Sequence, residues 1–138
     1  MFFSKKEENN DDTNLIKIAA LLIHTAKIDE NYTDEEEEII KKTLINLGAN
    51  KQNLESLITK AKLCEEDSNQ ILDFTKEIKN LEEPEKIKII KSLWAIIYSN
   101  QHADLYETNL MRRLAGLLYI DSKVMGNIKE QIKKDNLK

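Results

Sequence analysis

Two segments of the chain, residues 16–47 and 87–118, repeat one pattern at an offset of 71 positions (87 − 16 = 71). Each segment has a long apolar stretch, a short polar loop and a second stretch whose apolar residues recur every three or four positions, the spacing of one face of an α-helix. The matching positions include Ile16 with Ile87, Leu22 with Leu93, Glu36 with Glu107 and Leu47 with Leu118. A single helical hairpin cannot bury such a face, so the repeat predicts two hairpins that share one hydrophobic core.

The composition also favours an all-α fold. The 138 residues are 41% hydrophobic and include only three glycines and one proline, which leaves few of the turn residues that strands require. The spacing predicts about seven helices: one at 14–28, one from after Thr33 to near Gly48, others at 52–64, 68–81 and 105–118, one with Pro84 in its first turn, and a last helix that begins at Asp121.

We expect a flexible segment at 1–13, one helical domain at 14–134 and a frayed end at 135–138. No run approaches the ~20 apolar residues that a membrane span needs, and the start of the chain becomes acidic too early for a signal peptide. The expected location is therefore the cytoplasm. Phe2 and Phe3 beside two lysines allow weak contact with a membrane surface, but a flexible terminus or contact with the bundle explains them as well.

Charge and motifs exclude several classes of function. The net charge is −4, which argues against general nucleic-acid binding. The single cysteine, Cys64, rules out an intrachain disulfide, and its apolar helical surroundings predict a small buried side chain. No glycine-rich phosphate loop and no catalytic serine or cysteine motif is present. We therefore expect a binding module with a protein partner and no catalytic residues.

An acidic stretch, "KIDENYTDEEEEII" at 27–40, carries seven carboxylates from the end of the first predicted helix to the start of the second. Thr33 and Glu36 form a capping-box pattern, and the remaining glutamates suit the first turn of a helix. Capping does not explain Asp29, which falls at a helix C-terminus, where negative charge is unfavourable. Hard cations prefer oxygen ligands from short loops of this kind. Two interpretations therefore stay open: capping alone, or capping together with a divalent-cation site.

The segments "AKIDENYTDEE", "IYSNQHADLYE" and "LYETNLMRRLAGLLYID" resemble the tellurite-resistance protein B-like (TerB-like) family, and the likeness covers about residues 14–134. The resemblance implies a bundle of about seven helices, a link to tellurite resistance or stress response, and acidic residues proposed to bind divalent metal. The same domain type resembles the N-terminal region of the co-chaperone DjlA. The fold class expected from the resemblance is therefore the TerB-like all-α bundle.

The family's acidic positions, carried over by position, fall on Asp29, Glu36, Asn100 and Glu107. These are the candidate metal ligands, with Ca²⁺, Mg²⁺ or Zn²⁺ as the possible cofactor. The sequence departs from the family where Glu30 and Gln101 stand in place of glycine. Asn100 also lacks the charge of the family's second aspartate, so the second loop is a weaker ligand group than the first.

Two functions follow as hypotheses. In the first, a cation at the acidic loop stiffens a surface that binds a partner. In the second, the protein is a metal-independent interaction scaffold of the DjlA N-terminal type, with an exposed apolar groove between the hairpins. His24 is either a metal ligand or a partly buried histidine satisfied by a neighbour, and we favour the latter. Arg112, Arg113 and Lys123 mark either a partner surface or ordinary surface ion pairs, and we favour ion pairs.

Overall fold

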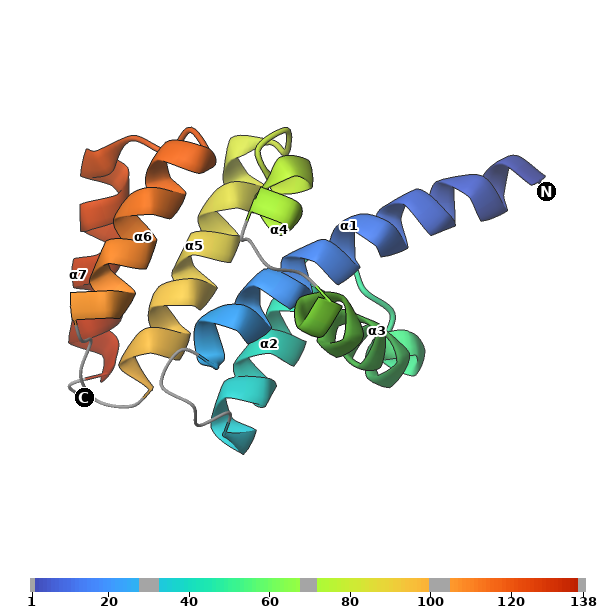
Figure 1. Ribbon diagram of the computed structural model, residues 1–138, viewed down its shortest axis with the longest axis horizontal. Helices are drawn as coiled ribbons and strands as arrows, with labels where there is room; N and C mark the ends of the chain where they lie inside the picture. The colour runs from blue at the N-terminus through green and yellow to red at the C-terminus, as the bar shows by residue number, and fades with distance from the viewer. Residues whose placement is uncertain (1, 28–32, 68–71, 100–104, 137–138) are drawn as a thin grey trace.

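The fold is all-α, as predicted. A computed structural model describes residues 2–27, 33–67, 72–99 and 105–136, and within these ranges the side chains of 2–13, 72, 77, 105–107 and 136 are left out of the description (Figure 1). The helices are α1 (Phe2–Ala26), α2 (Asp34–Asn46), α3 (Leu54–Asp67), α4 (Leu72–Ile78), α5 (Glu83–Tyr98), α6 (Leu105–Leu117) and α7 (Ser122–Asn136), with a 3₁₀ turn, η1 (Lys51–Asn53), before α3. No strand occurs in these ranges.

Most helix boundaries agree with the predicted ones, and the first helix differs. α1 begins at Phe2 instead of near Asn14, because residues 2–13 contain no glycine or proline to stop a helix. The N-terminal part of α1 consequently projects beyond the bundle (Figure 1). The predicted start of the fourth helix at Ser68 lies outside the described residues. The flexibility of 1–13 and the fraying of 135–138 stay predictions.

α1 and α5 are the central helices of the bundle. α1 packs against α2, α3, α4 and α5, whereas α5 also contacts α2 and α7. α6 and α7 lie at the end opposite to the projecting part of α1 (Figure 1). A hydrogen bond between the hydroxyl groups of Thr43 and Ser92 joins α2 to α5. The two predicted hairpins, α1–α2 and α5–α6, therefore meet chiefly through α5.

One cluster of buried apolar side chains draws on all seven helices. Leu22 and Leu93, which correspond in the repeat, are both 0% exposed. α1 is buried on every side from Ala19 to Ile23, as expected for a helix that other helices surround. The prediction that both hairpins contribute to a single core is confirmed.

The structural repeat extends beyond the predicted segments to the helix C-termini. The Ala49 N–H donates to the Leu44 carbonyl at 2.9 Å, and the Ile120 N–H donates to the Ala115 carbonyl at the same distance. This is the long bond of the Schellman motif, which satisfies carbonyl groups that a helix leaves unpaired at its end. The donors and acceptors are separated by the same repeat offset, 71 positions (120 − 49 = 71; 115 − 44 = 71). α2 and α6 therefore end in the same way.

The two Schellman motifs have different residues at the left-handed position. The left-handed position is Gly48 (φ 106°) after α2 and Tyr119 (φ 58°) after α6. A residue with a side chain costs about 1–2 kcal/mol in this conformation. Glycine avoids that cost, but it loses more backbone entropy on folding, which offsets part of the advantage. Tyr119→Gly is therefore expected to raise the free energy of unfolding in urea by up to about 1 kcal/mol, whereas Gly48→Ala lowers it by about 1 kcal/mol or more. If both variants changed the free energy of unfolding in the same direction, this account would be contradicted.

Candidate functional site: the acidic turn and the α6–α7 groove

α2 begins with the capping box that the sequence predicted. The Glu36 N–H donates to Thr33 Oγ1 at 3.1 Å, and the Thr33 N–H donates to Glu36 Oε1 at 2.8 Å. The Thr33 hydroxyl lies 3.0 Å from the same carboxylate oxygen. These reciprocal bonds satisfy two N–H groups that the start of a helix would leave unpaired. The predicted cap is confirmed.

Of the four candidate metal ligands, the structure places the side chain of one. Glu36 is 1% exposed and takes part in the cap. Asp29 and Asn100 lie outside the described residues, and Glu107 lies in α6 with a side chain that is not described. Among the side chains that the structure describes, no three His, Cys, Asp or Glu residues form a group that can hold a metal ion. The cation site therefore stays a prediction.

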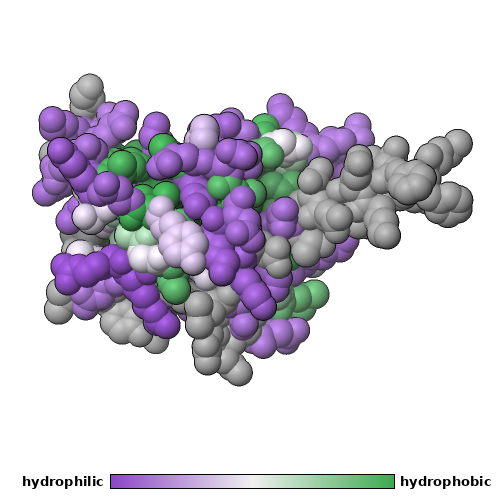
Figure 2. All heavy atoms as spheres, turned by 90° about the horizontal axis from the view of Figure 1, so that it is seen from above, coloured by the Kyte–Doolittle hydropathy of each residue, from purple (hydrophilic) through white to green (hydrophobic). Residues whose placement is uncertain are grey.

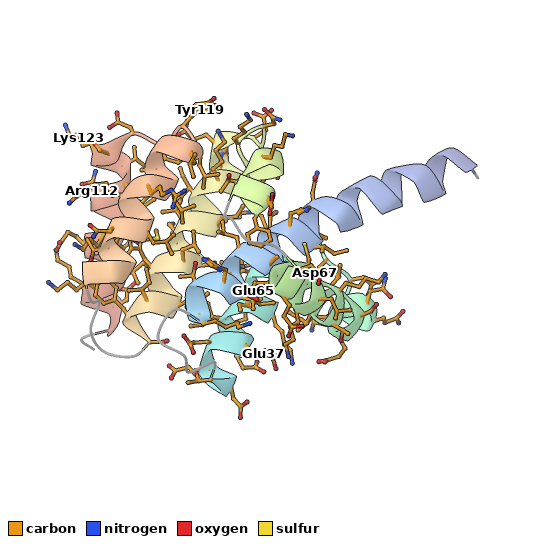
Figure 3. The ribbon with its side chains drawn as sticks, viewed as in Figure 1. Glu37, Glu65, Asp67, Arg112, Tyr119 and Lys123 are labelled. Atoms are coloured by element: carbon orange, nitrogen blue, oxygen red, sulfur yellow. The ribbon has the colours of Figure 1, made fainter. Side chains whose placement is uncertain are left out.

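The first turn of α2 carries Asp34, Glu35, Glu36 and Glu37, and we call it the acidic turn. Ion pairs beside it join α2 to α3, and Figure 3 labels Glu37. Lys62 Nζ lies 3.1 Å from Glu37 Oε1, and Lys41 Nζ lies 3.0 Å from Glu55 Oε1. The hydrogen bond to Glu55 raises the pKa of Lys41 above its usual value; desolvation opposes this in part, and the charges of nearby glutamates add to it. Because the Glu55 side chain is 81% exposed, this pairing adds little stability.

His24 has a protein partner. Its Nδ1 lies 3.5 Å from Glu65 Oε1, and Lys27 Nζ lies 2.9 Å from the other oxygen of the same carboxylate. The His24 ring also lies near the Phe74 ring, with 6.3 Å between their centroids. These contacts agree with the favoured interpretation, a partly buried histidine that a neighbour satisfies. Cys64, next to Glu65, is a half-buried free thiol, less buried than predicted.

A groove of about 390 Å³ lies between α6 and α7, and we call it the α6–α7 groove. Its floor includes Trp94 from α5, Met111 from α6 and Met125 from α7. The Trp94 Nε1–H donates to Met125 Sδ at 3.3 Å, which fixes the indole against α7. The space-filling view from above shows hydrophobic atoms reaching the surface among hydrophilic ones at the α6–α7 end (Figure 2). The three side chains are themselves almost fully buried (Met111 0%, Trp94 2% and Met125 6% exposed), so the groove lies directly over the hydrophobic core and exposes little of it.

Positive side chains border the α6–α7 groove. Arg112, which is exposed, lines it from α6, and Lys129 lines it from α7. Lys129 Nζ lies 5.5 Å from the centroid of the Trp94 ring, within the range of a cation–π contact. Figure 3 shows Lys123 at the same end of the molecule as Arg112. An acidic group entering the groove would meet at least two cations.

Tyr98 contacts Trp94, one of the residues that line the groove. Its ring stacks against Trp94 with 5.9 Å between centroids. Burial, followed by the charge of Glu130, raises the pKa of the Tyr98 phenol above its usual value of 10.0. The phenol is therefore neutral at physiological pH. Trp94 and Tyr98 are buried, yet the indole also forms part of the lining of the groove.

The sequence predicted an exposed apolar groove between the two hairpins. The structure has a hollow there that is smaller than the α6–α7 groove. That hollow, about 250 Å³, is lined by Leu15, Ile18, Leu47 and Glu85 among others and has a mixed polar and apolar lining. The more apolar α6–α7 groove was not predicted. The available signal was a pair of glycines, Gly116 and Gly126, inside segments that otherwise have a helical pattern.

The fold and the capped acidic turn define a small helical module with an internal repeat. The sequence model of the family described as "Tellurite resistance protein TerB" matches residues 15–130, most of the chain. The chain belongs to the TerB family, which confirms the resemblance found in its motifs. No curated protein and no solved structure matches it. Within the described ranges, every helix is too short or too polar to cross a bilayer.

Proposed function

We propose that this TerB-family chain is a non-catalytic binding module that takes a protein partner in the α6–α7 groove. The observation that carries the proposal is the groove of about 390 Å³ between α6 and α7, which Arg112 and Lys129 line from opposite helices. Tryptophan, methionine and arginine are enriched at the centres of protein interfaces, and charged side chains are more frequent at their rims. Binding of a partner in this groove needs no metal, so the proposal corresponds to the second of the two functional hypotheses, the metal-independent interaction scaffold.

The proposal is tested by capture of a partner in the presence of EDTA. Immobilised wild-type protein is incubated with extract of the native host, and retained proteins are identified by mass spectrometry and purified for rebinding. Gly116→Leu fills the groove, whereas Asn109→Leu places the same side chain on an exposed part of α6 that does not line it. We expect wild type and Asn109→Leu to bind the purified partner and Gly116→Leu to lose it. Equal binding by all three would refute the proposal.

The acidic turn supports a second candidate function, the binding of a divalent cation. The supporting observation is the concentration of carboxylates in the first turn of α2, where Asp34, Glu35 and Glu37 accompany the buried Glu36. A cation held by oxygen ligands would offset this charge. We propose Asp29 and Glu36 as the principal ligands, and Asn100 and Glu107 as the corresponding weaker pair.

Calorimetric titration with Ca²⁺, Mg²⁺ and Zn²⁺ tests the cation site. We expect wild type and Asp67→Ala, a variant of an exposed acidic residue on α3, to bind with similar weak affinity and Asp29→Ala to lose binding. Asp29 is the residue to vary because the capping box does not use it. Absence of a binding heat in the wild-type titration would end the hypothesis.

The family description adds a physiological expectation. Because it names tellurite resistance, we propose that the module contributes, from the cytoplasm, to growth of the host under tellurite stress. A strain that lacks the protein should grow less well on tellurite, and wild type and Asn109→Leu should restore growth better than Gly116→Leu. If all strains grew equally well on tellurite, this chain would not have the role that the family description names.

A further inference from the structure

In the second repeat, a lysine ammonium group fills the space between the start of α5 and the end of α6. Lys86 donates from Nζ to the Leu118 carbonyl at 2.9 Å, and the Tyr119 ring lies beside the same group, with 5.8 Å from Nζ to the ring centroid. Lys86 is only 9% exposed, so its alkyl stem lies inside the bundle while its charged end meets a carbonyl.

The first repeat has a hollow at the corresponding place. Positions 15, 47 and 48 correspond to 86, 118 and 119 (86 − 15 = 71; 118 − 47 = 71; 119 − 48 = 71). The residues at these positions are Leu15, Leu47 and Gly48, and all three line the hollow of about 250 Å³ between the hairpins. The space that a lysine and a tyrosine occupy at the end of α6 is therefore open at the end of α2.

The differences between the repeats explain why this space is open. Leucine has no hydrogen-bond donor in its side chain, so Leu15 cannot give the Leu47 carbonyl what Lys86 gives the Leu118 carbonyl. A Cβ atom built at Gly48 would meet no other atom within 4 Å. Lys88 does reach the end of α2, but its Nζ lies 3.4 Å from the Asn46 carbonyl and it does not line the hollow. The position that Lys86 fills is left without a cation by Leu15.

The charges around the hollow favour a positively charged ligand. Glu85 lines it from the start of α5, and Asn14 adds an amide oxygen that can accept a hydrogen bond. Leu47 and Gly48 directly follow α2, where the negative end of the helix dipole lies. Among the described residues that line the hollow, none is basic. The net charge of −4 also attracts cations to the chain.

The hollow is accessible and has an apolar side. Asn14, Leu47 and Glu85 are half-buried, and Gly48 is exposed, so a ligand can enter from solvent. Ile18, only 3% exposed, contributes to the apolar lining together with the leucines. Pockets for drug-sized ligands begin at about 300 Å³, so this smaller hollow suits one long side chain or a small aliphatic molecule.

We infer that the hollow between the hairpins binds a primary alkylammonium group, which takes the place that Lys86 fills in the second repeat. The ammonium group donates to the Leu47 carbonyl and pairs with Glu85, and the alkyl chain lies against Leu15 and Ile18. A lysine side chain of another protein and a free aliphatic amine both supply this chemistry. The hollow shares no lining residue with the α6–α7 groove, so the inference goes beyond the proposed function and is tested independently of it.

An NMR titration of the full-length, nitrogen-15-labelled chain with pentylammonium tests the inference. We expect the backbone amide signals of Gly48 and Ala49 to shift, with a dissociation constant of about 1 mM, as suits so small a ligand. Pentanol keeps the alkyl chain without the charge and should bind about tenfold more weakly.

Two further probes distinguish the sources of the ammonium group. N-acetyl-lysine methylamide represents a lysine within a protein, and diaminopentane represents a free amine. Tighter binding of the first assigns the hollow to a lysine of a partner, and tighter binding of the second assigns it to a small molecule. Either result supports the inference, because the group that binds is the same.

Two pairs of variants locate the site. Leu15→Lys places a lysine where the second repeat has Lys86 and should abolish binding by occupying the hollow, whereas Leu15→Met conserves volume and should retain it. Glu85→Gln should weaken binding about fivefold, and Glu83→Gln, an exposed acid in the same helical turn that does not line the hollow, should have little effect. Circular dichroism establishes that each variant folds, and the glutamate pair does not depend on the folding of Leu15→Lys.

Three results would overturn the inference. The first is the absence of shifts at Gly48 and Ala49 with every amine. The second is binding of pentanol as tight as that of pentylammonium, which would leave recognition of the chain without recognition of the charge. The third is unchanged binding of pentylammonium by folded Leu15→Lys or by Glu85→Gln, which would place the amine elsewhere on the molecule.

Discussion

Replacing Leu22 or Leu93 with alanine is expected to lower the free energy of unfolding by about 2–5 kcal/mol in each case. The two leucines hold corresponding positions on α1 and α5, and each is 0% exposed within the single core. The loss combines the transfer energy of the deleted methyl groups with the cost of the cavity that remains. Because the free energy of unfolding of a small domain is about 5–15 kcal/mol in total, either variant removes a large share of it.

Urea denaturation followed by circular dichroism measures both losses, with the slope of the transition expected to stay unchanged. Leu63→Ala is the control, because Leu63 is 58% exposed on α3 and its truncation should change stability by less than about 0.5 kcal/mol. Similar losses for Leu22→Ala and Leu93→Ala would agree with a core that both hairpins share. A small loss at one position and a large loss at the other would contradict that equal share.

Features that depend on neighbours in the sequence were predictable. The pattern at Thr33 and Glu36 predicted the capping box because both partners lie within one helical turn. Apolar spacing predicted the helices for the same reason. The two ends of the repeat illustrate the limit of this reasoning. The predicted repeat ends at Leu47 and Leu118, and the left-handed conformation that Gly48 and Tyr119 share one residue later is seen only in the backbone angles.

The α6–α7 groove was not predictable because it depends on how far α6 stands from α7. That distance is set by contacts between helices, and the sequence pattern defines only the apolar face of each helix. Trp94 is 2% exposed and belongs to the hydrophobic core. Trp94 also lines the groove, because Gly116 and Gly126 on the two neighbouring helices have no side chains to cover it.

The contact between α5 and the end of α6 gives the second large prediction. Lys86, 9% exposed, donates from Nζ to the Leu118 carbonyl at 2.9 Å, and its ammonium group lies 5.8 Å from the centroid of the Tyr119 ring. A cation at a helix C-terminus also complements the helix dipole. Lys86→Met keeps most of the side-chain volume but removes this donor. It should therefore lower the free energy of unfolding by about 1.5–3 kcal/mol, the usual worth of a hydrogen bond to a charged group.

Lys88 on the same helix provides the matched control. Its Nζ reaches the Asn46 carbonyl at the end of α2, so each Schellman motif receives a lysine from α5, but this distance is 3.4 Å and Lys88 is exposed. Solvent replaces an exposed donor easily, so Lys88→Met should cost less than about 0.5 kcal/mol. Urea denaturation of the two variants at neutral pH compares them directly. If Lys86→Met were no more costly than Lys88→Met, the buried lysine would not be what holds the end of α6 against α5.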